Sequence, residues 1–364
     1  MTPLRVVVAG GGTGGHLYPG IAVARELLRR EPDAQISFAG TARGIESRVI
    51  PREGFPLDLL RSVGLRGASP SAYARGLALI PTSLMDAWRI LSRRKPDVVI
   101  GVGGYSSGPV VVAAVLRRIP TLLLEQNAVP GLTNRWLARV VDAAAVTFEE
   151  TATYFGRRGF VTGNPVRAEF FESSVDQDEI CAVRGAPRVL IFGGSQGAHA
   201  INLAMVEAAP KLAADRGGLA ITHQTGERDL ELVRDGYRRA GLEARVEPFL
   251  FTMDREIKRA DFVVSRAGAT TLAELTAAGK AAVLIPLPTA ADDHQRKNAE
   301  VLARAGAAEV LDQRTLTGSG LADRILMLAR DTARRDAMGR AAQTLAKPHA
   351  ARAIADRVLA LAGR

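Results

Sequence analysis

Short β-branched runs alternate with helical patterns along most of this chain, and this alternation constrains the fold more than any other feature. In the first part of the chain, strand-like runs and helical patterns follow one another at residues 6–9, 20–30, 35–39, 98–102, 109–117, 121–125 and 132–140. Such a rhythm is typical of parallel strands joined by helical crossovers. The sequence therefore predicts an α/β fold built on a doubly wound parallel sheet.

The same rhythm restarts once, after a loop-rich stretch at residues 163–188. Strand-like and helical segments then follow at residues 189–192, 198–214, 220–224, 262–265, 282–286 and 309–311. A chain of 364 residues is also long enough for two α/β domains. We predict an N-terminal domain at 1–163 and a C-terminal domain at 164–347. A last helical pattern at 350–361 is not assigned by its periodicity, and we expect the helix at about 348–364 to pack back on the first domain.

Composition and charge narrow the possible partners. No apolar run approaches the roughly 18 residues needed to span a bilayer, and no signal-type leader precedes the first strand. The lone Cys181 cannot form a disulfide framework. We therefore expect a cytoplasmic protein. The net charge is +10, with 20 basic against 12 acidic residues in 1–163 and 28 against 26 in 164–364. The excess in the first part attracts polyanions. Aromatic residues are only 5%, and nucleic-acid modules are missing, so we expect no nucleic-acid partner.

The first glycine-rich turn, Gly10 to Gly15, matches G-x-G-x-x-G between a strand and a helix. A dinucleotide-binding domain would also need an acidic residue about 20 positions further on, for the ribose hydroxyls. That strand ends instead in Ala39-Gly40-Thr41. Arg43 could meet a 2′-phosphate, so an NADP-binding oxidoreductase stays open as an alternative of a different class. The pattern of a P-loop is missing.

Two further glycine-rich turns follow strands, at residues 101–108 and 193–197. Glycines let the backbone approach an anion closely, and the helix that follows presents free N–H groups and the positive end of its dipole. One such turn is usually tight packing only. Three turns at strand ends predict a binding site for a phosphorylated ligand, because ligands of parallel sheets gather at the carboxyl ends of the strands.

Glycine-rich and polar motifs are spread in order over nearly the whole chain. They are Gly11-Gly12-Thr13-Gly14-Gly15-His16-Leu17-Tyr18-Pro19, Gly103-Gly104-Tyr105, Glu125-Gln126-Asn127, Gly131-Leu132-Thr133-Asn134, Gly163-Asn164-Pro165-Val166-Arg167, Gly193-Gly194-Ser195-Gln196-Gly197, the run from Ser265 to Glu274, and Asp292-Asp293-His294-Gln295. These motifs resemble those of the MurG family of glycosyltransferases. The resemblance implies the GT-B architecture, two Rossmann-like domains whose parallel sheets face a central cleft. It also implies an inverting transfer without a cofactor.

The resemblance further implies which residues bind the nucleotide sugar. Ser195 and Arg167 would hold the diphosphate, Glu274 the ribose hydroxyls, and the backbone at Leu250 the uracil edge. Gln295 beside His294 would read the sugar hydroxyls. The other residues expected at the substrates are Thr13, Gly14, Gly15, Tyr105, Asn127, Ala269, Thr270, Thr271, Leu272 and Ala273. Each of three residues also has a purely structural alternative. Arg167 could be a solvated loop arginine, Glu274 a surface glutamate on a helix, and Asn127 an asparagine that caps a strand end.

The acceptor hydroxyl must lose a proton as it attacks the anomeric carbon. His16 is our candidate for the general base because imidazole titrates near neutral pH, and Glu125 is the rival base. Asp176-Gln177-Asp178 imitates a metal-binding D-x-D motif but lies in a polar stretch without a strand before it. We therefore expect no bound metal.

Residues 73–95 mix apolar and basic side chains. The helical stripe of Leu84, Ala87, Trp88 and Leu91 is expected in the core. Leu77, Leu79 and Ile80 are expected in an exposed patch, although an ordinary amphipathic helix explains the same pattern. With the basic excess, the patch predicts peripheral docking on the anionic cytoplasmic face of the bacterial inner membrane.

By this resemblance, the expected activity is transfer of N-acetylglucosamine from its UDP donor to O4 of undecaprenyl-pyrophosphoryl-N-acetylmuramoyl-pentapeptide, the step from lipid I to lipid II. Partners in cell-wall synthesis complexes are possible on the same ground. Another UDP-sugar transferase of this fold, acting on a glycolipid or small aglycone, is the nearest alternative. A non-catalytic membrane-docking protein is a further one.

Overall fold

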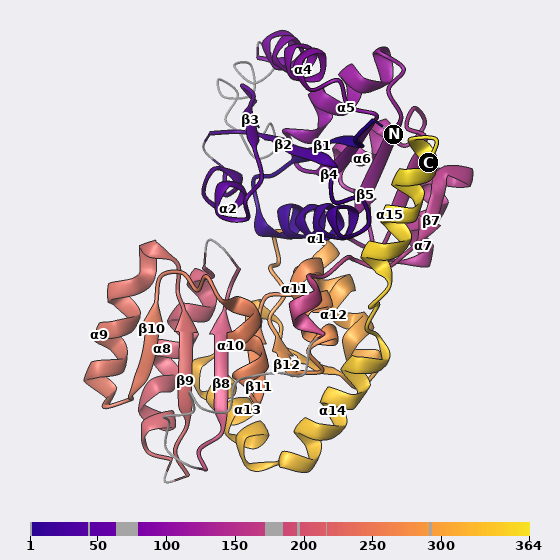
Figure 1. Cartoon of the computed structure of the whole chain (residues 1–364). Helices are drawn as coiled ribbons and strands as arrows, with labels where there is room; N and C mark the ends of the chain where they lie inside the picture. The colour runs from indigo at the N-terminus through magenta and orange to yellow at the C-terminus, as the bar shows by residue number, and fades with distance from the viewer. Residues whose placement is uncertain are drawn as a thin grey trace. The chain divides into compact units, whose positions relative to one another are not determined.

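The computed structural model describes residues 2–42, 44–62, 79–171, 185–194, 197–215, 217–290 and 293–364. By its contacts the chain divides into two compact units, one formed by residues 1–167 and 347–364 and the other by residues 168–346. Each unit contains one parallel sheet covered by helices (Figure 1). The predicted pair of parallel α/β sheets is therefore confirmed.

The described part of the first unit contains a seven-stranded sheet in the order β3-β2-β1-β4-β5-β6-β7. Every neighbouring pair is parallel. The central strands are apolar on both faces because helices cover both sides, which explains their unbroken Val and Ile runs. The strands are β1 Arg5–Gly10, β2 Gln35–Gly40, β3 Leu57–Leu59, β4 Val98–Gly103, β5 Thr121–Glu125, β6 Ala143–Val146 and β7 Gly159–Val161.

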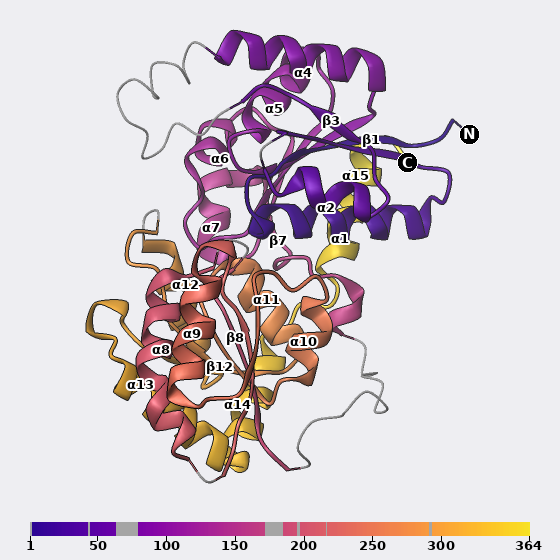
Figure 2. The ribbon, with the colours of Figure 1, turned by 90° about the vertical axis from the view of Figure 1, so that its left-hand side faces the viewer.

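Helices lie on both faces of this sheet, as Figure 2 shows for α4 and α5 on one side and α1 and α2 on the other. Apolar side chains of α4, α5 and α6 form a common core with strand residues such as Val7, Val99 and Leu123. On the opposite face Gly20 lets α1 approach Val8 and Val102 closely. The helices are α1 Gly14–Arg30, α2 Glu46–Arg52, α4 Ile80–Arg94, α5 Ser107–Leu116, α6 Leu132–Leu137, α7 Glu149–Ala152, the 3-10 helix η1 Thr153–Arg158, and α15 Ala350–Leu361.

The C-terminal helix α15 belongs to the first unit, although it follows the second unit in sequence. It packs against α1 (Figure 1). Ion pairs join Arg30 to Asp356 at 2.5 Å and Arg364 to Glu31 at 3.2 Å. The last residues of the chain thereby return to the unit formed by the first.

Three details of the first unit differ from the sequence-based expectations. Helix α1 begins at Gly14 and not near residue 20, because Thr13 has the extended backbone of an N-cap and the glycines after it are helical. Helix α6 ends at Leu137, before the expected end at residue 140. Trp88 was expected in the core but its surface is 45% exposed, since Ser83, Ala87, Ile90 and Leu91 form the buried face of α4.

The second unit contains, in its described part, a six-stranded parallel sheet in the order β10-β9-β8-β11-β12-β13. Its core lies between the strands and helices α8, α9, α13 and α14. The strands are β8 Arg188–Phe192, β9 Ala220–Gln224, β10 Ala244–Glu247, β11 Phe262–Ser265, β12 Ala281–Leu284 and β13 Ala308–Val310. The helices are η2 Ala168–Phe170, α8 His199–Ala213, η4 Glu227–Asp229, α9 Leu230–Ala240, α10 Met253–Arg259, α11 Ala269–Ala277, α12 His294–Arg304, η6 Gln313–Thr315, α13 Gly318–Arg330 and α14 Thr332–Thr344.

Both sheets have a topological switch point, where the strand order reverses direction. In the first unit it lies between β1 and β4, and in the second between β8 and β11. Open parallel sheets bind their ligands outside the carboxyl ends of the strands at such points. The three glycine-rich turns follow β1, β4 and β8, so each lies at a switch point of its own sheet.

None of the helices in the described ranges is long and apolar enough to cross a membrane.

Candidate functional site

The first and second glycine-rich turns touch one another at the switch point of the first unit. A Cβ atom on Gly10 would lie 2.6 Å from the carbonyl oxygen of Gly103, and one on Gly104 would lie 2.5 Å from that of Gly11. Gly12, Gly103 and Gly104 also have φ values of +84°, +96° and +79°. Only glycine combines this backbone conformation with this close approach.

His16 lies in the first turn of α1 and is half-buried against the second glycine-rich turn. Its Nδ1 lies 3.0 Å from Oγ1 of Thr13. A Cβ on Gly103 would lie 2.4 Å from Cδ2 of its ring, so that glycine makes the space for the imidazole. If Nδ1 carries the proton and donates it to Thr13, Nε2 is left with a lone pair. In the other tautomer Nδ1 accepts from the hydroxyl of Thr13, and in either case this contact restrains the orientation of the ring.

Glu46 is a buried carboxylate beneath the first turn that the sequence interpretation did not single out. It is 0% exposed. Its Oε2 accepts from the N–H of Gly12 at 2.8 Å, and its Oε1 accepts from the N–H and the hydroxyl of Thr41 at 2.8 and 2.9 Å. The hydroxyl of Tyr105 lies 3.4 Å from that of Thr41. Glu46 thus joins the ends of β1 and β2, with Tyr105 of the second turn nearby.

The rival base, Glu125, is 3% exposed at the end of β5. Its carboxylate accepts from the backbone N–H groups of Asn127 and Gly131, both at 3.0 Å, and from the side-chain amide of Asn134 at 2.9 Å. Burial raises its pKa, while these donors act in the opposite sense. Because both oxygens are occupied by the loop that follows β5, the geometry favours a structural role for Glu125.

Asn127 and Arg167 are anchored within the first unit. The side-chain amide of Asn127 donates to Glu125 at 3.3 Å, and the backbone carbonyl oxygen of Asn127 accepts from the hydroxyl of Thr151 at 3.2 Å. The guanidinium of Arg167 lies 4.9 Å from the ring centroid of Tyr18, in a cation–π geometry. Tyr18 is on α1, so Arg167 is held at the helix that begins with the first glycine-rich turn.

The third turn, Gly193 to Gly197, precedes α8 in the second unit. Gly194 and Gly197 have φ values of +96° and +73°. A Cβ on Gly197 would lie 1.9 Å from the carbonyl oxygen of Thr225, so a side chain cannot be accommodated there. Ser195, the expected diphosphate contact, lies outside the described residues, as does Arg43 of the first unit.

Gln224, at the end of β9, links this turn to the segment expected to read uracil. Its Nε2 donates to the carbonyl of Gly194 at 3.0 Å, and its Oε1 accepts from the N–H of Leu250 at 2.8 Å. Both Gln224 and Leu250 are buried. Since the N–H of Leu250 is already engaged, its carbonyl is the group that remains for a base edge. Gln224 was not singled out from the sequence.

A polar chain extends from the start of α8 into the core of the second unit. His199 Nδ1 lies 2.9 Å from Asp229, and Asn202 donates to Asp229 at 2.8 Å and to the carbonyl of Thr225 at 2.9 Å. His223 lies 3.1 Å from Oδ1 of Asn202 and 2.8 Å from the hydroxyl of Tyr237. This chain supports the backbone of Thr225, against which Gly197 packs.

Helix α11 carries the expected ribose ligand. Glu274 is 7% exposed, so it is not the surface glutamate that a helical position alone would suggest. Thr270 and Leu272 are also buried, while Ala269, Thr271 and Ala273 are partly exposed. Arg266, just before the helix, is 8% exposed and donates to the carbonyl of Ile285 at 2.9 Å. Burial lowers the pKa of Arg266 to about 10, which still leaves it positively charged at neutral pH.

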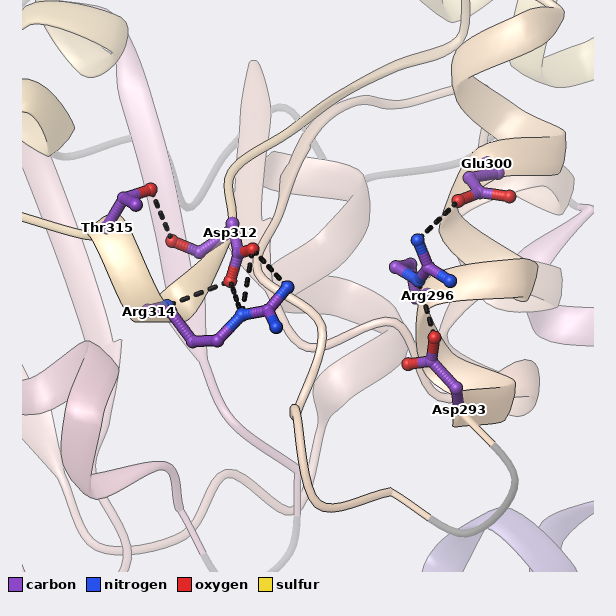
Figure 3. Close-up of polar contacts among 6 residues, drawn as sticks. All are labelled: Asp293, Arg296, Glu300, Asp312, Arg314 and Thr315. Atoms are coloured by element: carbon purple, nitrogen blue, oxygen red, sulfur yellow. Dashed lines mark hydrogen bonds and ion pairs between the residues drawn. The ribbon is translucent and has the colours of Figure 1, made fainter.

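Helix α12 begins with His294 and Gln295. Oε1 of Gln295 accepts from the N–H of Leu287 at 3.0 Å, which leaves the side-chain NH₂ as a donor. Exposed ion pairs surround this helix start: Figure 3 shows Arg296 between Asp293, at 2.5 Å, and Glu300, at 3.7 Å. The same view contains the pair of Asp312 and Arg314 at 2.7 Å, and the hydroxyl of Thr315 bonded to the carbonyl of Asp312. Such exposed pairs each contribute little to stability.

Clusters of three or more His, Cys, Asp or Glu side chains able to hold a metal are missing from the described ranges. The Asp176-Gln177-Asp178 sequence, Cys181 and Leu77 lie outside those ranges.

Comparisons with known proteins identify the family to which each part of the chain is similar. Residues 6–146 match the glycosyltransferase family 28 N-terminal domain, and residues 188–357 match the glycosyltransferase family 28 C-terminal domain. A UDP-N-acetylglucosamine--N-acetylmuramyl-(pentapeptide) pyrophosphoryl-undecaprenol N-acetylglucosamine transferase of Anaeromyxobacter sp. (strain K) is 49% identical over 362 residues, which cover 99% of this chain and 94% of the relative.

A relative of the same description from Geobacter sulfurreducens is 47% identical over 358 residues, covering 98% of each chain. Among solved structures, the crystal structure of MurG from Acinetobacter baumannii has a TM-score of 0.73 at 33% identity, and the match covers 98% of this chain and 100% of that one. The chain therefore belongs to glycosyltransferase family 28 and, within it, to the family of UDP-N-acetylglucosamine--N-acetylmuramyl-(pentapeptide) pyrophosphoryl-undecaprenol N-acetylglucosamine transferases.

Proposed function

We propose that this chain transfers N-acetylglucosamine from UDP-N-acetylglucosamine to O4 of undecaprenyl-pyrophosphoryl-N-acetylmuramoyl-pentapeptide, with inversion at the anomeric carbon. The observation that carries the proposal is the 49% identity over nearly the full length of a relative described by this reaction. The product is lipid II, and the reaction requires no cofactor.

The second unit binds the nucleotide in this proposal. The glycine-rich turn before α8, with Ser195, holds the diphosphate, and residues 269–273 extend that contact at the start of α11. Buried Glu274 accepts the two ribose hydroxyls, and the carbonyl of Leu250 accepts the N3–H of uracil. The free NH₂ of Gln295, with His294 beside it, donates to hydroxyls of the sugar. Helix N-termini suit this task because negative charge grows on the leaving phosphate oxygen as the sugar–oxygen bond breaks.

The first unit supplies the base and the remaining contacts. His16 takes the proton of the attacking hydroxyl on Nε2 while Thr13 holds Nδ1, and this arrangement is supported by the 3.0 Å contact between them. Gly14, Gly15, Tyr105 and Asn127 line the acceptor and sugar side of the turn. Arg167, fixed over Tyr18, adds positive charge for the diphosphate.

Product analysis tests the proposal directly. Purified full chain is given UDP-N-acetylglucosamine and a short-chain lipid-linked acceptor, and products are identified by mass spectrometry. We expect His16→Ala to lower kcat by about 100-fold, the usual size of a lost general base. We expect Glu274→Gln to raise the Kd of UDP by about tenfold or more, the cost of losing a hydrogen bond to a charged group.

Matched variants separate these effects from general damage. His349 and Glu243 are exposed residues of the first and second unit, so His349→Ala and Glu243→Gln should leave both quantities within twofold. A wild-type chain that turns over a small aglycone but not the lipid-linked acceptor would favour another UDP-sugar transferase. Thermal stabilisation by NADP and not by UDP would favour the oxidoreductase.

We also propose that helices α4, α5 and α6 dock on an anionic membrane surface such as the cytoplasmic face of the inner membrane. These helices pack consecutively on one side of the sheet (Figure 2). Together they expose apolar side chains: Ile80, Met85, Trp88, Val112, Leu116 and Trp136 are 38–76% exposed. Arg117 lies over the ring of Trp88 at 5.1 Å, so basic and apolar groups are interleaved as at membrane interfaces.

A further inference from the structure

The first glycine-rich turn already contains an anion, and that anion is part of the chain. Turns of this kind in nucleotide-binding domains direct their backbone N–H groups at a bound phosphate. Here the N–H of Gly12 donates to Oε2 of Glu46 at 2.8 Å. A pyrophosphate cannot use this N–H unless it displaces a carboxylate that is 0% exposed.

The surroundings of Glu46 are built to hold that carboxylate. A Cβ on Gly11 would lie 2.4 Å from its carboxyl carbon, one on Gly40 would lie 2.6 Å from its Cγ, and one on Gly44 would lie 2.0 Å from its Oε2. Three glycines from two separate turns therefore make room for one side chain. Such convergence is expected where a buried polar group must keep all of its hydrogen bonds.

The hydrogen bonds of Glu46 connect elements that are distant in sequence. Oε1 takes both donors of Thr41 at the end of β2, and Oε2 takes Gly12 at the end of β1. Thr41 in turn lies 3.4 Å from the hydroxyl of Tyr105, whose ring lies against Gly12. The residues immediately after Gly12 are Thr13 to His16, which contain the proposed base.

We propose that Glu46 is the positioning residue of the first turn: its carboxylate occupies the anion position of the turn and holds residues 13–16 in the geometry that transfer requires. The kinetic part of this inference rests on the proposed function, whereas the structural part does not. It follows that the turn presents His16 and Thr13 to the substrates and does not bind a pyrophosphate through Gly12.

Glu46→Gln is the informative substitution because it keeps the shape of the side chain and replaces one acceptor oxygen with an NH₂ donor. The three donors to Glu46 need two acceptor oxygens, and an amide offers one oxygen and an NH₂ group. Whichever way the amide is turned, a donor faces Gly12 or Thr41. We expect hydrogen exchange of the amides in residues 11–14 to become at least tenfold faster, as measured by mass spectrometry on the full chain.

The kinetic effect should divide between kcat and binding. A displacement of about 1 Å at a catalytic group costs about 100-fold in rate, so kcat should fall by about 10- to 100-fold. The Kd of UDP, measured by calorimetry, should stay within twofold because the proposed nucleotide contacts are in the second unit. Thr41→Val removes one donor of the three and is the milder variant, for which a fall in kcat of about two- to tenfold is expected.

Asp142→Asn is the control for the hydrogen-bond pattern, at an exposed position. Asp142 accepts from the N–H and hydroxyl of Thr121 at 2.8 and 3.0 Å, the same pattern as Glu46 with Thr41, but at the amino end of the sheet. The kcat of the Asp142→Asn variant and its hydrogen exchange at residues 11–14 should match those of the wild type. Unchanged exchange in both Glu46→Gln and Thr41→Val, or unchanged kcat in a folded Glu46→Gln, would overturn the inference. If the wild type transfers no sugar but Glu46→Gln still exchanges faster at residues 11–14, the structural role of Glu46 is supported and only the proposed function is refuted.

Discussion

Acid should destabilise the second unit through one buried histidine, His223. This side chain is 0% exposed on β9, and burial lowers its pKa from 6.5 to about 3. Asn202 donates its amide to Asp229 and Thr225, so its Oδ1 accepts from Nε2 of His223, and Nδ1 accepts from the hydroxyl of Tyr237. A second proton on the ring would remove that acceptor and place an unpaired charge in the core.

The size of the effect follows from the two pKa values. Between pH 6.5 and about 3 the unfolded chain binds a proton at His223 that the folded chain excludes, so the free energy of unfolding falls as the pH falls. The slope is about 1.4 kcal/mol per pH unit, so the loss is about 2 kcal/mol at pH 5 and roughly 4–5 kcal/mol near pH 3. Above pH 6.5 His223 makes no further contribution to the pH dependence.

Urea unfolding at pH 7, 6 and 5, followed by hydrogen-exchange mass spectrometry of peptides from β9 and α9, measures this slope. His223→Gln should be less stable than the wild type at pH 7, because its hydrogen bonds are imperfect. Its free energy of unfolding should, however, lack the slope of about 1.4 kcal/mol per pH unit that His223 contributes below pH 6.5. His349→Gln, at an exposed position, should retain the wild-type slope. Equal slopes in the wild type and His223→Gln would refute the reasoning.

Two further predictions concern the nucleotide turn and the apolar face. Gly197→Ala should weaken UDP binding by more than tenfold in calorimetry, since its Cβ would lie 1.9 Å from the carbonyl oxygen of Thr225. Gly241→Ala is the control and should not weaken binding, because Gly241 has a similar φ of +69° but no atom lies within 4 Å of its Cβ position. Equal losses in the two variants would point to backbone strain alone. Trp136→Ser should lower partition onto anionic vesicles by about tenfold, and Tyr154→Ser, which removes a smaller exposed aromatic side chain elsewhere on the first unit, should have little effect. Equal effects would argue against docking by α4, α5 and α6.

Much of the fold could be predicted because parallel strands buried on both faces leave a strong pattern. Strands β5, β9 and β11 have the bounds expected from their apolar runs. Helix starts were harder, since the glycines at 14 and 15 suggest a loop until the N-cap geometry of Thr13 is seen. The exposure of Trp88 was also missed, because a helical stripe does not show which of its edges meets a neighbouring helix.

The candidate site was predictable only in part. The glycine-rich turns could be found because their residue types are needed locally, for backbone conformation and close approach. Glu46 and Gln224 were not found, since each bonds to a segment that lies far from it in sequence: Gly12 is 34 residues from Glu46, and Leu250 is 26 residues from Gln224. One signal was present for Glu46: two glycines, Gly40 and Gly44, occur in the short segment before it.

The sequence by itself determined the alternation of strands and helices, the restart that produces a second sheet, and the turns at strand ends, because periodicity and glycine content act over short stretches of chain. Only the tertiary structure decided which polar groups support those turns. Buried carboxylates and amides must satisfy their hydrogen bonds with whatever the fold brings within about 3 Å. For Glu46 these partners are Gly12 and Thr41, and for Gln224 they are Gly194 and Leu250. Apart from the bond between Glu46 and Thr41, which are five residues apart, these contacts come from strand order, which no local pattern contains.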